Sequence, residues 1–562
     1  MKLPFLIIGI TLCICTQTIG QKLMGNEAHQ MDELLKEWDK TDAPGIAIAV
    51  LKDGEVVYKK CAGLANLEYD TPITDTSKFN TTLITQQFTA FAILLLEQQG
   101  KLSLEDDIRK YIPEVPDFGK TIALKHLASH TSGLRDNGSI AAMQGRGSVD
   151  AVTTRDALRL LSKQKKLNFD PGEEYNYCGT GYILLAEVVE SVSKMSFSQF
   201  CNKHIFQPLK MNNSFVYSNY LKVIKNRTYS YFLNSDGYNK RSSNDQSDGE
   251  SNIFSSLDDL ISWTLNFSNL KIGDATIINK MNTRFVLNGG DTLSVGFGQD
   301  VGGYKGLPEF LSRGSKGGYR SQISRFPSEN FSIIFLSNSG EANSYKLIQE
   351  VTEIYLADKL LPTPLMEPND IKIIEKSGDE EFTRNQVCGL YRHESGKLGW
   401  EINVYQKDTD LNVSMDFIDC HFHIGNNVGN KYEILENKPV KFGFTVSQND
   451  QAQVLTKYEN GHVSVWKRVD KEDVSKTNLN DYTGEFYSEE LSTTYNLKVI
   501  DGKLTLKHYR LSPFTFQQTG LNNFKGEVWF LNQLEFVRDV SKKITGFKIS
   551  NLRARNVYFV KK

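Results

Sequence analysis

The groups of this chain that could perform nucleophilic chemistry occur in short patterns. Ser162-x-x-Lys165 and Ser191-x-x-Lys194 each place a lysine one helical turn after a serine, and Ser312 also lies near a lysine. A lysine at this spacing can take the proton of a serine that attacks an acyl group. A four-residue pattern of this kind is common by chance, so the elements that position the residues decide whether the chemistry is real.

The stretch 79–100, FNTTLITQQFTAFAILLLEQQG, predicts a buried helix of about seventeen residues with a short polar lead-in, around which the rest of the chain is organised. Phe88, Phe91, Ala92 and Leu95 follow the i, i+3, i+4, i+7 rule, and further apolar residues fill the other faces, which is typical of a core helix. Gly100 can adopt the left-handed conformation that ends many helices. The apolar run is too short and too closely flanked by polar residues for a membrane span.

The same stretch resembles the central helix of the serine β-lactamase and penicillin-binding-protein group, in its class C and esterase-like branch. The resemblance rests on Phe79, on Gln87-Phe88-Thr89-Ala90 and on the following GKLSLED run. That family carries a nucleophilic serine and, one turn later, a lysine in this lead-in, where this sequence has Leu83 and Gln86. Leucine has no group that can attack a carbonyl, and glutamine cannot accept the proton.

A second segment, Pro171 to Tyr182, resembles the family's Tyr-Ser-Asn or Tyr-Ala-Asn segment. The tyrosine, Tyr177, is retained, whereas Cys178 and Gly179 occupy the other two places. By resemblance Tyr177 would be a general base, but a phenol stays protonated at neutral pH unless a neighbouring cation lowers its pKa. With glutamine in the lysine position, we expect Tyr177 to be a hydrogen-bonding wall residue.

The third segment, 311–321, resembles the family's Lys-Thr-Gly or His-x-Gly strand. Ser312 stands in the position of the cation or imidazole, and Gly314 is retained. Four positions that carry the family's chemistry are therefore changed together, namely Leu83, Gln86, Gly179 and Ser312. Loss of the nucleophile alone costs about six orders of magnitude in turnover in a triad-type hydrolase.

A relocated nucleophile is the alternative to lost activity. Thr82 and Thr85 flank the changed serine position, and Cys178 follows Tyr177. Each would need a base beside it, and the sequence shows none. The segment 122–134, IALKHLASHTSGL, contains two histidines, but by resemblance it packs and caps the helical region, so we interpret it as a marker of the fold.

The composition of the chain is that of an ordinary protein with a net charge near zero. The chain has 562 residues, 40% of them hydrophobic, with 65 Lys and Arg against 67 Asp and Glu. A net charge near zero gives no reason to expect nucleic-acid binding.

Residues 1–20, with Lys2 and an apolar run, predict a signal peptide. We therefore expect a secreted or periplasmic protein with no membrane span after removal of the signal peptide. A retained anchor is the alternative. The five remaining cysteines do not form a disulfide framework.

The hydrophobic pattern predicts the following organisation. Strands 46–51 and 55–60 form a hairpin around Asp53-Gly54, and the strand 331–338 and helix 343–358 close the first domain. We predict a β-lactamase-related domain over 21–362, a β-rich unit over 363–475 and a second β unit over 476–562 that resembles a lipocalin-like C-terminal domain. The two β units begin 95 residues apart, with CGLY and TGEFY, and strands are expected at 400–405, 411–415, 495–500, 503–507 and 528–531.

The fold class predicted is therefore α/β: a β-lactamase/transpeptidase-like antiparallel sheet with a helical subdomain, followed by all-β barrel-like units. We expect a pseudoenzyme whose cleft, lined by Tyr177, Cys178, Ser312 and Gly314, binds a peptide, a cell-wall fragment or a small amide or ester. A hydrolase or acyltransferase with a relocated nucleophile is the alternative. No cofactor is expected, and the His421 and His423 pair on one strand is a weak indication of metal because no third ligand accompanies it.

Overall fold

The computed structural model describes residues 26–147, 150–219, 221–241, 244–362, 388–393, 401–407, 410–415, 418–424, 440–446, 452–459, 462–469, 474 and 477–562. The chain divides into two compact units, one comprising residues 1–138 and 146–363 and the other 139–145 and 364–562. The two units are described separately.

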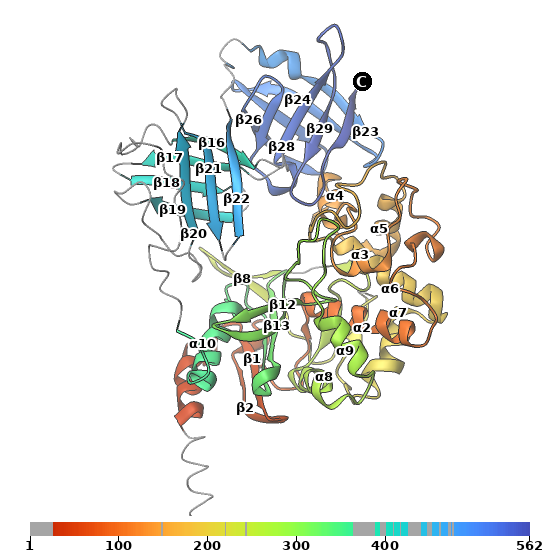
Figure 1. Cartoon of the computed structure of the whole chain (residues 1–562), viewed down its shortest axis with the longest axis vertical. Helices are drawn as coiled ribbons and strands as arrows, with labels where there is room; N and C mark the ends of the chain where they lie inside the picture. The colour runs from red at the N-terminus through yellow and green to blue at the C-terminus, as the bar shows by residue number, and fades with distance from the viewer. Residues whose placement is uncertain are drawn as a thin grey trace, which may run out of the picture. The chain divides into compact units, whose positions relative to one another are not determined.

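The first unit is built on a six-stranded antiparallel sheet (Figure 1). In spatial order its strands are β12 (Asp300–Tyr304), β13 (Leu307–Lys316), β14 (Tyr319–Phe326), β15 (Phe331–Ser337), β1 (Ile46–Lys52) and β2 (Glu55–Ala62). The predicted hairpin joins β1 to β2, and both Asp53 and Gly54 adopt positive φ angles of 52° and 83°. Two consecutive positive φ angles are typical of the turn that joins antiparallel strands most tightly.

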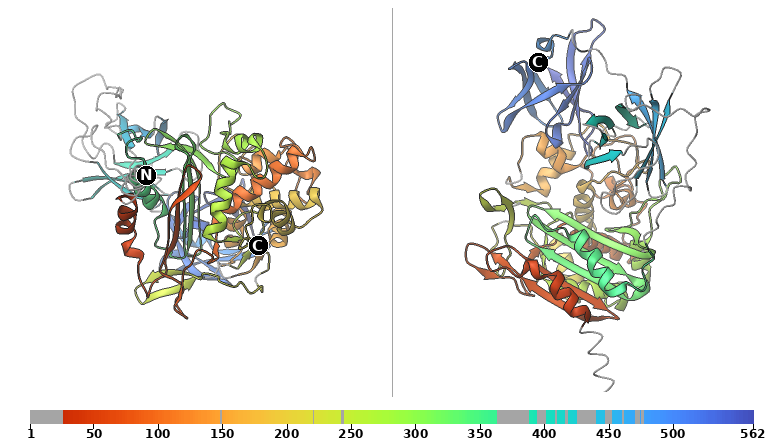
Figure 2. Two further views of the ribbon diagram at one scale, coloured as in Figure 1. Left: turned by 90° about the horizontal axis from the view of Figure 1, so that it is seen from below. Right: turned by 90° about the vertical axis from the view of Figure 1, so that its left-hand side faces the viewer.

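Both faces of this sheet are covered (Figure 2). Ala47, Ala49 and Leu51 of β1 belong to the core under helices α2 (Thr85–Gln98) and α8 (Leu257–Asn269). Ile46, Ile48 and Val50 belong to the core under α10 (Ser344–Leu356) and the helical residues 26–34. A strand buried on both faces is apolar at every position, which is why 46–51 reads IAIAVL.

The central helix is shorter than the sequence predicts. Its lead-in forms strand β5 (Phe79–Asn80) and the 3-10 turn η2 (Thr82–Ile84) before α2 runs from Thr85 to Gln98. The Thr82 amide donates to the Asn80 side chain at 2.7 Å, and Thr82 has a φ of 50°, so the helix cannot begin earlier. Phe88 of α2 stacks on Trp263 of α8 with ring centroids 4.2 Å apart, and Gly100 has the expected positive φ of 67°.

The other helices of the first unit surround α2 and cap the sheet. They are α3 (Leu124–Ala128), α4 (Asn137–Met143, which continues into the second unit), α5 (Thr154–Leu161), α6 (Gly179–Ser193), α7 (Phe197–Cys201), α8 (Leu257–Asn269), α9 (Ala275–Asn282) and α10 (Ser344–Leu356). A small sheet of β5, β11 (Ile253–Ser255) and β7 (Phe215–Val216) holds the segment before Ile253 beside the start of α2.

Strand β13 crosses η2 in close contact. A Cβ atom on Gly314 would lie 2.1 Å from Thr82 Oγ1 and 2.4 Å from the Leu83 amide nitrogen. The Thr82 hydroxyl also forms a hydrogen bond of 2.5 Å with the hydroxyl of Ser321, which lies on the neighbouring strand β14. Only glycine fits at residue 314 while the sheet and the start of α2 stay this close.

The second unit is all-β. Its first part is a seven-stranded sheet of β16 (Gly389–His393), β17 (Glu401–Lys407), β18 (Asp410–Met415), β19 (Ile418–Ile424), β20 (Val440–Val446), β21 (Ala452–Glu459) and β22 (His462–Val469). The second part is a closed barrel of β23 (Gly484–Ser488), β24 (Thr493–Ile500), β25 (Lys503–His508), β26 (Leu511–Gln518), β27 (Asn523–Gly526), β28 (Gln533–Arg538), β29 (Ile544–Ser550) and β30 (Val557–Lys561). The pairing of β23 with β30 closes the barrel, and Phe486, Phe536 and Phe547 pack against one another among its buried residues.

One predicted strand is wrong. Residues 528–531 form a 3-10 turn, η8 (Trp529–Leu531), in which the Leu531 amide donates to the Val528 carbonyl at 3.0 Å. Leu531 is fully buried whereas Trp529 is 62% exposed, so the apolar residues mark a packed turn between β27 and β28. An apolar run of four residues does not distinguish these two structures.

Three other predictions concern residues that the structure does not describe, or describes only in part. Residues 1–20, expected to be a signal peptide, lie outside them, as do the side chains of His421 and His423 on β19. Cys61, Cys178, Cys201 and Cys388 carry free thiols, and the Cys420 side chain is not described. None of the helices in the described part of the chain is long enough and apolar enough to cross a bilayer.

The contact between β13 and η2 predicts the effect of a single methyl group. Gly314→Ala should lower the free energy of unfolding by about 1–3 kcal/mol, because the atoms it meets include a backbone amide that cannot move aside. Urea denaturation followed by near-ultraviolet circular dichroism would measure the loss. Gly302→Ala on β12 of the same sheet is the matched control, since nothing lies within 4 Å of its Cβ position, and an equal loss in both variants would contradict the prediction.

Candidate functional site

Leu83 occupies the position where the sequence predicted a lost nucleophile, in the 3-10 turn before α2. The half-buried side chain lines a cavity of about 190 Å³. The turn itself is held by the Asn80 side chain and by the contact between the Thr82 and Ser321 hydroxyls. The backbone that would present a nucleophile is therefore in place, and the side chain on it is an alkyl group.

Gln86, one turn further along, is hydrogen-bonded to the retained tyrosine. Its amide nitrogen donates to the Tyr177 hydroxyl at 3.0 Å, and that hydroxyl donates to Glu250 Oε1 at 3.1 Å. The phenol proton is thus directed at a carboxylate. Gln86 is neutral, so it supplies no positive charge that would favour the ionised form of the Tyr177 hydroxyl.

Glu250 is a cleft residue that the sequence analysis missed. A Cβ atom on Gly179 would lie 2.2 Å from Glu250 Oε1, so the carboxylate fills the space that a side chain at residue 179 would need. Glu250 reaches this place because Thr89 donates to the Gly249 carbonyl at 2.7 Å and Thr85 accepts from the Ile253 amide at 3.2 Å. The only hint in the sequence is Gly179 itself, whose missing side chain leaves space for another residue.

Ser312 lies on β13, which forms the opposite wall. It is 4% exposed and lines the same cavity as Leu83, Gln86 and Tyr177. Three of the four changed positions and the retained tyrosine therefore meet at one site. Gly314, two residues further along β13, does not line the cavity, contrary to the expectation, because it lies against Thr82 and the Leu83 amide and gives the strand its close approach.

The remaining lining of the cavity mixes aromatic, apolar, polar and charged side chains. It is formed by His130, Tyr175, Tyr182, Val295, Leu311, Asp300 and Arg313, together with Gln299. His130 accepts from the Cys178 amide at 3.2 Å, and its ring lies over Tyr177 with centroids 4.6 Å apart. The histidine segment that we interpreted as a fold marker therefore also supplies one wall residue.

The residues considered as relocated nucleophiles are placed differently. Cys178 is buried in the core and does not line the cavity, contrary to the expectation, because it caps α6 with its side chain turned inward. Burial raises the pKa of its thiol to about 12, so it carries no thiolate at neutral pH. Thr82 and Thr85 are fully buried, and both hydroxyls make hydrogen bonds inside the protein.

The two Ser-x-x-Lys patterns have structural roles. The Ser162 hydroxyl donates to the Arg159 carbonyl at 3.0 Å, and the Ser191 hydroxyl donates to the Tyr111 carbonyl at 3.1 Å. Lys194 ends α6 in the left-handed conformation. Within the described residues, no cluster of three His, Cys, Asp or Glu side chains could hold a metal ion.

Comparison with known protein families identifies the family of the first unit. Residues 26–352 match the family described as Beta-lactamase. The chain belongs to the beta-lactamase family. The resemblance inferred from the sequence is thereby confirmed, and so is the predicted fold of antiparallel sheet and helices followed by a barrel.

Two known proteins and one solved structure illustrate what the chain is similar to. The chain is 27% identical over 297 residues to a D-aminopeptidase of Gluconobacter oxydans, and this alignment covers 52% of the chain and 56% of the relative. It is 28% identical over 313 residues to penicillin-binding protein 4* of Bacillus subtilis, and that alignment covers 53% of the chain and 69% of the relative. The octameric penicillin-binding protein homologue from Pyrococcus abyssi matches with a TM-score of 0.53 and 22% identity over 86% of this chain and 98% of that one, which shows a shared fold.

His126 gives the beta-lactamase-family unit a dependence on pH. Its Nδ1 accepts from the Ala123 amide at 3.2 Å, and burial lowers its pKa to about 4. The unfolded chain has a histidine pKa of about 6.5 and so binds more protons between these two values, which makes the folded state less stable as the pH falls. Because the ring is partly exposed, we expect a loss of about 1 kcal/mol from pH 7 to pH 4.5.

Urea denaturation at the two pH values measures this loss. His126→Asn is the control, because its side-chain oxygen can still accept from the Ala123 amide but does not titrate in this range. Its loss of stability should be smaller than that of the wild-type protein by the amount assigned to His126. An identical loss in both proteins would show that other groups carry the pH dependence.

Proposed function

We propose that this protein is a secreted or periplasmic pseudoenzyme of the beta-lactamase family that binds a ligand in its cleft and does not transfer acyl groups. The observation that carries the proposal is the hydrogen-bonded chain from Gln86 through Tyr177 to Glu250, beside the alkyl side chain of Leu83. The polar groups that would activate a nucleophile are satisfied by one another. The location rests on the sequence of residues 1–20 alone.

The lining of the cavity supports a ligand of mixed character. Aromatic, apolar and uncharged polar side chains line it, and Asp300 and Arg313 add two opposite charges. A volume of about 190 Å³ is smaller than the pockets of about 300–1,000 Å³ that enclose drug-sized molecules. It suits the terminal residue of a peptide or cell-wall fragment, or a small amide or ester.

The second candidate is a hydrolase or acyltransferase with a relocated nucleophile. One observation favours it, namely that Ser312 is the aliphatic hydroxyl among the residues that line the cavity, with His130 on the same lining. Ser312 and His130 come from opposite walls, and His130 already contacts the Cys178 amide through Nδ1. We therefore rank this candidate second.

Labelling with a fluorophosphonate and with a penicillin tests the proposal directly. We expect no adduct on the wild-type protein by intact-mass spectrometry and an adduct on the Leu83→Ser, Gln86→Lys variant, because the turn that presents residue 83 is preserved. The matched control is Gln86→Lys alone, which restores the cation without a nucleophile and should remain unlabelled. An adduct on the wild-type protein would overturn the proposal, and its mapping to Ser312 would establish the second candidate.

Ligand binding by the cleft can be measured with N-acetyl-D-alanyl-D-alanine in saturation-transfer NMR. The wild-type protein should give a signal that Leu83→Trp abolishes, because the indole would fill the cavity. Leu221→Trp, at an exposed position of the same unit, is the control and should keep the signal. Equal signals from all three proteins would show that the probe does not bind in the cleft.

A further inference from the structure

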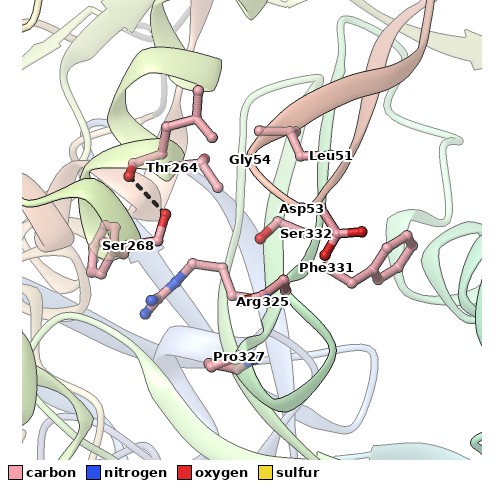
Figure 3. A pocket seen from close by; sticks show the side chains of 12 residues that line it. Leu51, Asp53, Gly54, Thr264, Ser268, Arg325, Pro327, Phe331 and Ser332 are labelled. Atoms are coloured by element: carbon pink, nitrogen blue, oxygen red, sulfur yellow. Dashed lines mark hydrogen bonds between the residues drawn. The ribbon is translucent and has the colours of Figure 1, made fainter.

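A larger cavity of the first unit, of about 330 Å³, lies between α8 and the sheet (Figure 3). Arg325 of β14 lines it and donates to Gln299 Oε1 at 2.7 Å, and within the described residues it has no carboxylate partner. Arg325 Nε and Thr264 Oγ1 are both buried from solvent, so neither atom is presented to a ligand there. These two groups therefore belong to the packing between α8 and the sheet.

Helix α4 begins in the first unit and ends in the second. It has seven residues, Asn137–Met143, and residues from Ser139 to Gly145 belong to the second unit. A helix of this length is marginal in water, because the cost of its first turn exceeds the gain from the few hydrogen bonds that follow. The stability of α4 therefore depends on the contacts at its two ends.

The barrel of the second unit holds the C-terminal end of α4. The Tyr495 hydroxyl on β24 donates to the Met143 carbonyl, and Gln144 Nε2 donates to the Leu491 carbonyl at 2.7 Å. The last carbonyls of a helix have no partner inside the helix, so the Tyr495 hydroxyl caps α4. Ile140 and Met143 are also buried. This end of α4 is therefore fastened by both polar and apolar groups.

The anchor on the barrel is rigid. Tyr495 is fully buried, and its ring stacks on Phe559 with centroids 4.5 Å apart. Gly145, just after the helix, has a φ of 83°, and a Cβ atom there would lie 2.5 Å from His508 Cε1 and 3.1 Å from Arg510 Cβ. Close-packed side chains of this kind do not yield to small displacements, so the end of α4 has one position on the barrel.

The N-terminal end of α4 is bonded to the first turn of α6 in the first unit. The Asn137 amide donates to Thr180 Oγ1 at 2.7 Å, and the Gly179 amide donates to Asp136 Oδ2 at 2.9 Å. Gly179 lies directly against Glu250, the carboxylate that accepts from the tyrosine of the cleft. The residues at the start of α4 therefore help to place one side of the candidate site.

We propose that the barrel is a positioning element for the cleft, and that it acts through α4 with Tyr495 as the positioning residue. With the cap in place, α4 is complete and its first residues hold the first turn of α6. Without the cap, so short a helix melts as a unit, and the contacts of Asp136 and Asn137 with α6 loosen with it. Only the consequence for ligand binding rests on the proposed function of the cleft.

Amide hydrogen exchange of the full chain, followed by mass spectrometry, tests this coupling. Tyr495→Phe removes the capping hydroxyl and keeps the ring. We expect amides in two segments, 137–145 and 179–181, to exchange about three- to tenfold faster, as loss of one hydrogen bond implies for a local opening. Amides of β28 and β29 should exchange as in the wild-type protein. Tyr487→Phe, at a 36% exposed position on the adjacent strand β23, is the matched control and should change neither segment.

Gly145→Ala is a second variant, because its methyl group would meet the His508 ring, and it should accelerate exchange in the same two segments. Faster exchange confined to residues 139–145 would show that α4 does not transmit the loss to α6. Faster exchange throughout the barrel would reduce Tyr495 to a stabiliser of the barrel. Either result, or unchanged exchange in both variants, contradicts the proposal.

The effect on the cleft itself is measured with N-acetyl-D-alanyl-D-alanine. Its saturation-transfer signal should weaken in Tyr495→Phe and stay unchanged in Tyr487→Phe. An unchanged signal beside faster exchange would limit the barrel to stabilising α4 and would refute its role in positioning the cleft. If the wild-type protein gives no signal, the proposed function fails, whereas the exchange measurement still decides whether the barrel and α6 are coupled.

Discussion

The close passage of β13 across the turn before α2 is the constraint on which the first unit depends. Residue 314 has room for a hydrogen atom and no more, since the Thr82 hydroxyl and the Leu83 amide occupy the place of a Cβ atom. This contact sets the distance between the sheet and the central helix, and with it the positions of Leu83 and Ser312 on facing walls. Backbone packing forms the cleft, so the cleft can outlast the chemistry of its side chains.

The polar groups inside the cleft form hydrogen bonds with one another. In an active hydrolase the nucleophile and base are held ready for the substrate, with pKa values shifted toward their task. Here the hydroxyl of Tyr177 accepts from Gln86 and donates to Glu250, so the three groups satisfy one another. Gln299, which also lines the cleft, accepts a hydrogen bond from the buried Arg325 on β14.

Sequence reasoning predicted the elements with strong periodicity and the residues that lie in recognisable segments. The hairpin at Asp53-Gly54, the buried α2 and the gathering of Leu83, Gln86 and Ser312 follow from patterns local in the chain. Glu250 could not be found in this way, because it enters the cleft through hydrogen bonds of neighbouring residues to Thr85 and Thr89, which are more than 150 positions away. The same limit applies to Arg325, whose lack of a counter-charge is visible only when its neighbours from four segments are assembled.

The contact between Glu250 and residue 179 also links changes at these two positions. A methyl group at Gly179 would lie 2.2 Å from Glu250 Oε1, so the flexible Glu250 side chain would have to turn away. Shortening Glu250 first removes the acceptor of the Tyr177 hydroxyl but creates no clash. The effect of a side chain at residue 179 therefore depends on the residue at position 250. One substitution at Gly179 would change two contacts of the cleft, because a displaced Glu250 could no longer accept from the Tyr177 hydroxyl.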